Sequence, residues 1–384
     1  MNNLLYLDHD VLFFLDPDLI NNKKYPEYFC DFKVKNKYFN IYNEYRKSRI
    51  DYETFPTPWT LEPTQFPIPK LPTTKINFND TVDESIISVA KQIDQGRTAY
   101  LFWSGGIDST MIAVALFKNL TASQLTQVCF IMGPESIDEN PQFYDKYIKN
   151  YKHINLNWFE IPDFIAGLDL TKTLLLNGEG ADYLIGHSMA YNIFYQNPSA
   201  VMQPWTQYID LIKTNFSDNN IAVEYHDSTL DIIVTTAKLA GKELNTIYDF
   251  YWWACYNFRF DSVLFRNCPF IGEKIESDQD FAYLVKNCYF NLYADPKIQQ
   301  WTMSADITEK LDFNKKLVKL SYKKYIYEFD KNELYFMKKK KRFSWTPTRG
   351  GQVSLTKYFA FDNNYRRYSI FDRSVRQQLK QIFY

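Results

Sequence analysis

The sequence predicts an α/β fold in which a parallel sheet carries helices on both faces. Short apolar runs typical of buried strands recur between residues 99 and 176, and segments with helical periodicity separate them. Glycine-rich turns follow two of these runs, where a strand passes sharply into a helix. Strand signals fade after about residue 190, so a mostly helical C-terminal half and a small, β-rich N-terminal region complete the predicted fold.

The first 78 residues are expected to precede the sheet. Residues 1–55 form a small N-terminal region, whose alternating segment at 28–34 favours short strands. Residues 56–78 hold six prolines between Pro56 and Pro72, which exclude a helix or a central strand. This part of the chain is therefore predicted to be an extended linker.

The main domain is predicted at residues 79–350. Its α/β core occupies residues 79–190, and its helical part occupies residues 191–350. The remaining residues, 351–384, form a basic C-terminal extension.

Helices and strands alternate through the predicted core. The first helix begins at a cap among residues 79–81 and carries one apolar face, formed by Val82, Ile86, Val89 and Ile93. Four strands are expected, at residues 99–103, 128–133, 156–161 and 173–176. Another helix is expected at 141–150, and beyond the core residues 244–260 and 278–293 favour helices.

Composition places the chain among globular proteins, and its 384 residues suit two or three domains. No apolar run approaches the ~20 residues that a membrane-spanning helix needs. The first residues lack the basic and apolar segments of a secretory signal. The five cysteines are scattered without a Cys-x-x-Cys pair, which argues against a zinc site or a disulfide framework. A cytoplasmic protein with no membrane partner is therefore expected.

Charge is distributed unevenly along the chain, although the net charge is only −1. Residues 301–384 carry 19 Lys and Arg against 8 Asp and Glu, a net +11, so the first 300 residues carry −12. A basic segment of this kind either pairs with the acidic body or binds a polyanion, and the sequence leaves both readings open.

The hexapeptide Ser104–Ser109, Ser-Gly-Gly-Ile-Asp-Ser, lies between the strand expected at 99–103 and an apolar helical segment at 110–117. Backbone N–H groups without partners and the positive end of the helix dipole favour an anion such as phosphate at this turn. Its two glycines let the backbone approach that anion closely. A carboxylate at Asp108 makes electrostatic sense beside a phosphate if a cation such as Mg²⁺ lies between them.

A second loop, residues 177–182, reads Asn-Gly-Glu-Gly-Ala-Asp and directly follows the strand expected at 173–176. It repeats the design of a strand, a glycine turn and a helical stretch. Its two carboxylates, Glu179 and Asp182, are of the type that holds a metal or carries a proton beside a phosphate site. Taken alone, the segment also fits an acidic surface turn.

Together the two loops resemble the synthetase domain of asparagine synthetase and β-lactam synthetase, within the PP-loop ATP pyrophosphatase superfamily. That family pairs Ser-Gly-Gly-x-Asp-Ser with a later Gly-Glu-Gly-Ser/Ala-Asp motif. The resemblance covers residues 80–190 well and continues weakly to about 350. Tyr183 and His187 depart from it, since the family usually has Glu and Gly at these positions.

The resemblance implies ATP and Mg²⁺ as cofactors. The pyrophosphate end of ATP would be held by Ser104, Gly105, Gly106 and Ser109. Gly178, with backbone near Trp103 and Met132, would border the adenosine, and Gly180 would also bind the nucleotide. Asp108, which also belongs to the nucleotide loop, would hold Mg²⁺ together with Asp182.

The resemblance also implies an amide-forming ligase, which adenylates a small-molecule carboxylate, releases pyrophosphate and transfers the acyl group to ammonia or an amine. Glu179 would be the general base that deprotonates the attacking amine. Lys340 stands three residues before Phe343, as the family's lysine does, and would stabilise the departing pyrophosphate.

Asparagine synthetase carries an N-terminal glutaminase, which this sequence is not expected to contain. The nucleophilic cysteine of that domain is replaced by Asn2, and about 80 residues before the core are too few for it. Nitrogen would then come from free ammonia, from an amine on the substrate, or from a glutaminase or pathway-enzyme partner.

Two other functions remain open at this level. A PP-loop enzyme could modify a nucleic-acid base, with the basic C-terminal segment contacting phosphates. A degenerate member could bind nucleotide and serve as a scaffold. The amide ligase is expected first, because both carboxylates of the second loop are intact.

Overall fold

The chain folds into two units built from interleaved segments. Unit 1 comprises Met1–Ile68, Gly186–Phe270 and Ser354–Tyr384, and unit 2 comprises Pro69–Ile185 and Ile271–Val353. The computed structural model describes residues 4–6, 49, 67–186, 188–218, 223, 226–265, 268–338, 359–362 and 367–369.

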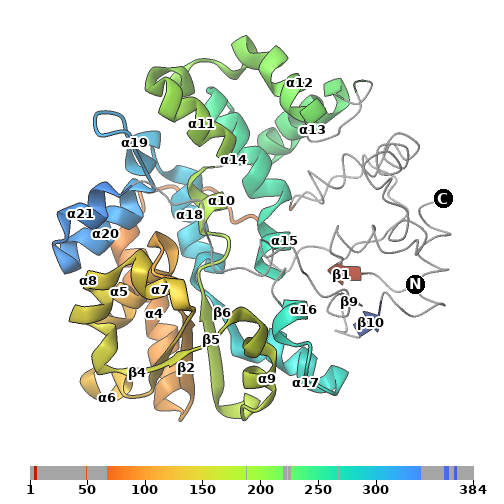
Figure 1. The fold of residues 1–384 in the computed structure, drawn as a ribbon. Helices are drawn as coiled ribbons and strands as arrows, with labels where there is room; N and C mark the ends of the chain where they lie inside the picture. Colours follow the sequence, from red (N-terminus) through yellow and green to blue (C-terminus); the bar gives the residue numbers. More distant parts are fainter. Residues whose placement is uncertain are drawn as a thin grey trace, which may run out of the picture. The chain divides into compact units, whose positions relative to one another are not determined.

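Unit 2 is built on a five-stranded sheet in which all neighbouring strands run parallel, in the order β4-β3-β2-β5-β6 (Figure 1). Its strands are β2 (Thr98–Phe102), β3 (Val128–Met132), β4 (Lys152–Asn155), β5 (Thr173–Asn177) and β6 (Tyr289–Asn291). Every residue of β3 and β5 is buried, as expected for central strands of a parallel sheet that helices cover. The prediction of a parallel α/β sheet is therefore confirmed.

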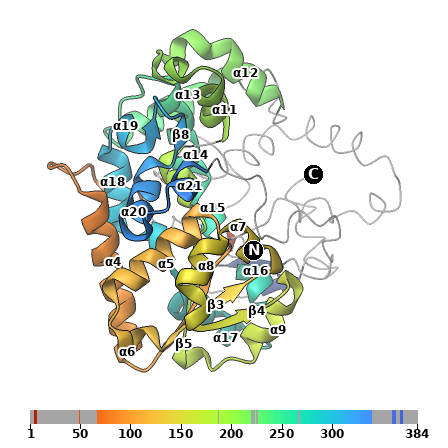
Figure 2. The ribbon, with the colours of Figure 1, turned by 60° about the vertical axis from the view of Figure 1, so that its left-hand side comes forward.

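Helices flank this sheet, and α5 packs beside both α4 and α20 (Figures 1 and 2). The helices of the first segment are α4 (Phe78–Asp94), α5 (Ile107–Asn119), α6 (Ala122–Leu125), α7 (Pro134–Glu139), α8 (Pro141–Lys146), α9 (Ile161–Ala166) and α10 (Ala181–Ile185). The second segment adds a hairpin of β7 (Leu311–Asp312) and β8 (Leu317–Val318). It also adds the helices α17 (Asp278–Tyr283), α18 (Pro296–Ser304), α19 (Ile307–Lys310), α20 (Leu320–Asp330) and α21 (Glu333–Met337).

The order of the strands places a topological switch between β2 and β5. From β2 the chain proceeds outward to β3 and β4, and it then returns to the other side of β2 to form β5 and β6. Because all these strands are parallel, the loops that follow β2 and β5 leave the sheet at the same edge and beside each other. Ligands of open α/β sheets bind at such a point.

Helix α4 confirms the apolar face expected from the sequence. Its residues at the predicted spacing are all buried: Val82, Ile86, Val89 and Ile93. The helix begins slightly earlier than predicted, because the side chain of Asn77 is the N-cap and accepts a hydrogen bond from Asp80 N at 3.2 Å.

Two sheet predictions were wrong. The third strand is β4 at Lys152–Asn155, whereas residues 156–161 turn through a short 3₁₀ helix into α9. Being an edge strand with its end residues exposed, β4 has no continuous apolar run to reveal it. The helix expected at 278–293 ends early, because residues 289–291 pair with β5 as the strand β6. The helix expected at 141–150 is α8, followed by a 3₁₀ turn at 148–150.

Unit 1 contains helices and a small sheet. Its helices are α11 (Ser188–Gln196), α12 (Ile209–Asp218), α13 (His226–Leu239), α14 (Ile247–Phe258), α15 (Phe260–Phe265) and α16 (Cys268–Ile271), the last of which ends in unit 2. All residues of α14 except Asp249 are buried, and the rings of Trp252 and Tyr256 stack with centroids 5.3 Å apart. This helix lies within the range predicted at 244–260.

The sheet of unit 1 joins the two ends of the chain. Strand β1 (Leu4–Tyr6) pairs antiparallel with β9 (Phe359–Asp362), which also pairs with β10 (Arg367–Ser369). The segment at 28–34, predicted to form strands, lies outside the described residues.

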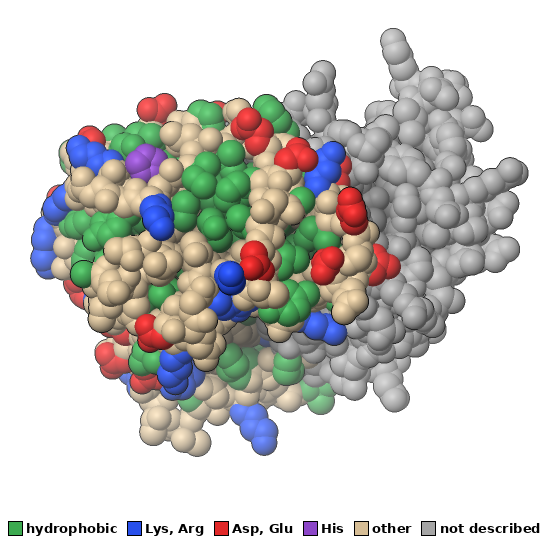
Figure 3. All heavy atoms as spheres, turned by 90° about the horizontal axis from the view of Figure 1, so that it is seen from below, with side chains coloured by type: hydrophobic (Ala, Val, Ile, Leu, Met, Phe, Trp, Pro, Cys, Tyr) green, Lys and Arg blue, Asp and Glu red, His purple; other side chains and the backbone are tan. Residues whose placement is uncertain are grey.

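The helices and the surface charge were compared with what a membrane or a polyanion partner would require. Among the described residues, no helix has both the length and the apolarity that crossing a bilayer requires. Figure 3 shows one face of the molecule, on which basic and acidic side chains are interspersed among apolar ones and neither sign dominates.

Candidate functional site

The loop after β2 turns sharply into α5. Gly105 has φ +71°, and a Cβ there would overlap the carbonyl oxygen of Ser136 and lie 2.8 Å from Cβ of Glu139. Gly106 is the N-cap of α5 and provides no side-chain hydrogen bond to the first turn. The backbone N–H groups of that turn thus have no side-chain cap from Gly106, as an anion site requires.

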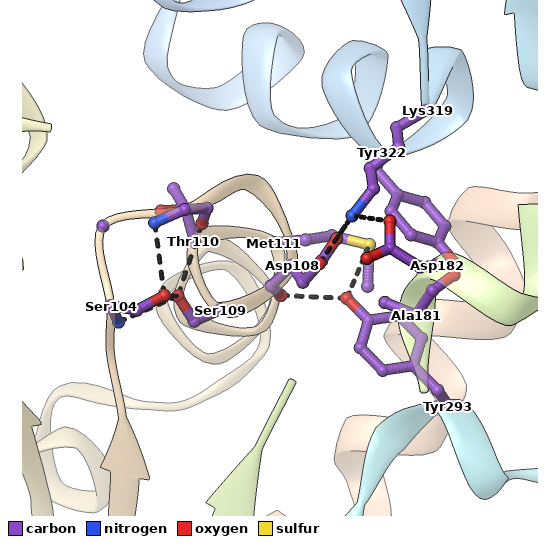
Figure 4. A network of polar contacts seen from close by, with 12 residues as sticks. Ser104, Asp108, Ser109, Thr110, Met111, Ala181, Asp182, Tyr293, Lys319 and Tyr322 are labelled. Carbon is purple, nitrogen blue, oxygen red and sulfur yellow. Dashed lines mark hydrogen bonds and ion pairs between the residues drawn. The ribbon is translucent and has the colours of Figure 1, made fainter. Parts of the chain in front are cut away.

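Hydroxyl groups hold this loop in shape. Ser104 N donates to Ser109 Oγ at 3.0 Å, and the two serine hydroxyls lie 3.1 Å apart (Figure 4). The indole Nε1 of Trp103 donates to Thr110 Oγ1 at 3.1 Å, and Tyr335 donates to Gly105 O at 2.9 Å. The two serines predicted to bind phosphate are therefore adjacent in the loop.

The loop after β5 is fixed by an asparagine pair. The buried Asn177 Oδ1 accepts from Glu179 N and from Asn291 Nδ2, each at 2.9 Å, and Asn291 also donates to Glu179 O. Asn177 and Asn291 are register partners at the ends of β5 and β6. The overlooked strand β6 thus positions the candidate base Glu179.

The two loops touch each other at Gly178. A Cβ on this residue would lie 3.2 Å from Ser109 N and 3.3 Å from Cβ of Asp108. Gly180 adopts φ +84°, which turns the chain into α10. The structure therefore brings together the two motifs that the sequence separates by about 70 residues.

A lysine that the sequence reasoning missed lies between the two predicted metal carboxylates. The ammonium of Lys319 donates to both carboxylate oxygens of Asp108, at 2.5 Å from Oδ2, and lies 2.8 Å from Oδ1 of Asp182 (Figure 4). Burial alone would lower the pKa of Lys319, but the two carboxylates raise this pKa above its ordinary value. The side chain therefore stays charged and bridges the loops.

The β7–β8 hairpin brings Lys319 to the site. Asp312 Oδ1 accepts from Asn314 N at 3.0 Å and Lys315 N at 2.9 Å, which fixes the turn. Lys319 follows β8, stands at the N-cap position of α20 without a side-chain capping bond, and has a left-handed backbone with φ 59°. Lys319 belongs to no sequence motif. The one signal for it was indirect: two carboxylates that lie close together need a cation between them.

Two tyrosines also support the site and were not predicted. Tyr293 donates to the carbonyl of Asp108 at 2.9 Å, and Tyr322 donates to the carbonyl of Ala181 at 3.3 Å. Burial, together with the nearby charge of Asp108, raises the pKa of Tyr293 well above its ordinary value. Tyr293 is therefore a neutral donor that anchors the start of α5.

The remaining predicted site residues differ in their placement. The side chains of Trp103 and Met132 are fully buried, so their contact with a nucleotide stays a prediction that requires rearrangement. Glu179 is half-buried in the second loop. Lys340 lies outside the described residues, as does His187.

The carboxylates suit Mg²⁺ by their chemistry, since this ion binds one or two carboxylates together with phosphate oxygens and water. Within the part of the chain that the structure describes, no three His, Cys, Asp or Glu side chains gather as a complete metal site. Asp108 and Asp182 would therefore need the phosphates of a nucleotide to complete the coordination of the ion.

A second buried lysine, Lys323, lies one turn after Lys319 on α20. Its Nζ donates to the carbonyl of Lys338 at 2.6 Å. Burial, and secondarily the charge of Lys319, lowers the pKa of Lys323 from 10.5 to about 8. An unfolded lysine keeps its proton up to its ordinary pKa, so between these values the folded protein binds fewer protons than the unfolded one.

The free energy of unfolding is therefore expected to rise with pH from about 8 toward 10.5, and below this window the unfavourable contribution of Lys323 is fully present. Denaturant unfolding of the wild type and of Lys323→Met, near pH 7.5 and near pH 9.5, measures this contribution. In Lys323→Met, most of this rise in the free energy of unfolding between the two pH values should be absent. An equal rise in both proteins would contradict the assignment of the pH dependence to Lys323.

No family model and no curated protein matches this sequence.

Proposed function

We propose that unit 2 is an ATP-dependent amide-forming ligase that cleaves ATP between its α and β phosphates. The observation that carries this proposal is the meeting of two glycine loops at the switch point of the sheet, with the carboxylates of Asp108 and Asp182 converging beside them. The resemblance of these loops to those of asparagine synthetase and β-lactam synthetase supplies the reaction type.

The first loop would bind the phosphates of ATP. The Gly105–Gly106 turn and the first turn of α5 present backbone N–H groups, and the helix dipole favours negative charge at that end. The adjacent hydroxyls of Ser104 and Ser109 would exchange their mutual hydrogen bond for phosphate oxygens. Binding would thus orient the α phosphate for attack by a carboxylate.

Asp108 and Asp182 are the residues that would hold Mg²⁺, which when bound would neutralise phosphate charge. Glu179 would take the proton from the amine that attacks the acyl-adenylate, with its backbone held by Asn177 and Asn291.

Lys340 is proposed to stabilise the departing pyrophosphate. Lys338, two residues earlier, lies 2.8 Å from Oε1 of Glu139, whose Cβ adjoins the Gly105 position. This contact supports the proposal, because the basic run begins beside the phosphate loop.

The test is to incubate the full chain with ATP, Mg²⁺, ammonium or amines, and a panel of small carboxylic acids. AMP and pyrophosphate are the expected products, and an accepted acid should also promote exchange of labelled pyrophosphate into ATP. ADP and inorganic phosphate as products, or a lack of any acid-dependent exchange, would contradict the proposal.

Glu179→Gln provides a matched control for the role of the base. Because the base acts after adenylation, this variant should keep pyrophosphate exchange and lose amide formation by about 10²–10⁴-fold. Loss of both activities together would assign Glu179 to nucleotide binding instead.

A further inference from the structure

The ammonium of Lys319 occupies the position that a cation between the two loops would take. It contacts both oxygens of Asp108 and one oxygen of Asp182, and its side chain is only 2% exposed. The side chains of Asp108 and Asp182 are 25% and 35% exposed, whereas Oδ1 of Asp182, the oxygen that lies against the ammonium, is buried. A solvent cation that reaches them meets a pair that already has a positive charge between its members.

The fold holds Lys319 in this place. Its chain neighbours Val318 and Leu320 are buried, so the backbone on both sides is anchored in the interior. Its left-handed conformation is unfavourable for a residue other than glycine, so the surrounding contacts must maintain it. These features make the contact part of the folded framework and distinguish it from a surface ion pair.

We propose that Lys319 is an internal counter-cation that excludes free divalent cations from the Asp108–Asp182 pair. A divalent cation such as Mg²⁺ binds carboxylate oxygens at about 2.0–2.1 Å, where the ammonium already in contact with them would repel it and would occupy part of their lone pairs. The two cations therefore compete for the same oxygens, and the covalently attached one has the advantage of proximity.

This inference rests on the proposed function in one respect, namely that a metal belongs at this pair during the reaction. An incoming phosphate would offer the ammonium a competing anion and would free carboxylate oxygens for the metal. Metal and nucleotide would then bind with positive coupling, and the coupling would act in both directions.

The experiment measures Mn²⁺ binding to the full chain without nucleotide, from the loss of the free Mn²⁺ signal in electron paramagnetic resonance. The wild type should bind Mn²⁺ only weakly, and Lys319→Arg, which retains the charge, should bind it as weakly. Lys319→Met should bind about 5–150-fold more tightly, the usual size of coupling between two binding events. Adding Asp182→Asn to Lys319→Met should remove this gain.

Lys323→Met is the matched control, because the ammonium of this buried lysine on the same helix donates to a backbone carbonyl. It should bind Mn²⁺ as the wild type does. Lys319→Met is expected to be less stable without metal, and Mn²⁺ should raise its melting temperature more than that of the wild type. If Lys319→Met is destabilised but its melting temperature does not respond to Mn²⁺, Lys319 forms only a structural ion pair, and the proposal is overturned.

Equal Mn²⁺ affinity in the wild type and in Lys319→Met would also overturn it. None of these arms contains nucleotide, so they stand apart from the test of the proposed function. A separate titration with α,β-methylene ATP tests nucleotide binding, and its failure would count against the ligase while leaving the comparison of the lysine variants intact.

Discussion

Replacing Asp108 with asparagine is expected to lower the rate of AMP and pyrophosphate formation by about 10²–10³-fold, the usual effect of removing one group that stabilises charge in a transition state. Asp108 lies in the first turn of α5, contacts Lys319 and supplies one of the two carboxylates that would hold Mg²⁺. Asparagine keeps the size of the side chain but cannot neutralise either cation. The loss should therefore appear in the chemical step as well as in nucleotide affinity.

Asp83→Asn is the matched control for this substitution. Asp83 also pairs with a lysine, Lys118 at 3.0 Å, and accepts from Asn119 at 2.8 Å and from the hydroxyl of Tyr325. Its side chain is 30% exposed, close to the 25% of Asp108, but it lies on α4 outside both glycine loops. The control should lose stability without losing catalysis. Equal activity of Asp108→Asn and Asp83→Asn would remove Asp108 from the mechanism.

That the two loops lie at the same edge of the sheet could be predicted from the sequence, because it depends on local signals and on one topological rule. The apolar runs of β2 and β5 are interior parallel strands, and a glycine follows soon after each, Gly105 after β2 and Gly178 after β5. Once both runs belong to one parallel sheet, the loops after them leave the same edge. The strand order that makes β2 and β5 neighbours has no comparable local signal, because it depends on how the connecting helices pack.

Lys319 could not be predicted on the same grounds. Its place depends on a two-residue strand, an Asx turn at Asp312 and a left-handed backbone, none of which produces a periodic pattern. The contact with Asp108 spans 211 positions of the chain. Strand β6 could not be predicted for a related reason: its three residues form a strand because they pair with β5. Tertiary pairing decides such short elements, and local propensity does not.

Replacing Gly105 with alanine is the second substitution with a large expected effect. The residue has φ +71°, which costs an L-residue about 1–2 kcal/mol. The new Cβ would also overlap the carbonyl oxygen of Ser136 and press on Glu139, and overpacking of this kind typically adds about 1–3 kcal/mol. We expect the free energy of unfolding to fall by about 2–5 kcal/mol in total.

Gly96→Ala separates the two contributions. Gly96 lies between α4 and β2 with φ +90°, but nothing lies within 4 Å of the position that its Cβ would take. This variant should therefore show the backbone strain alone, about 1–2 kcal/mol, and should keep its affinity for α,β-methylene ATP.

Gly105→Ala should lose more stability and should also lose nucleotide affinity, because moving the loop away from α7 misplaces the N–H groups at the start of α5. Denaturant unfolding and nucleotide titration of both variants measure the difference. If the two alanines lower stability equally and leave nucleotide affinity unchanged, the close approach of Gly105 to α7 does not shape the phosphate loop.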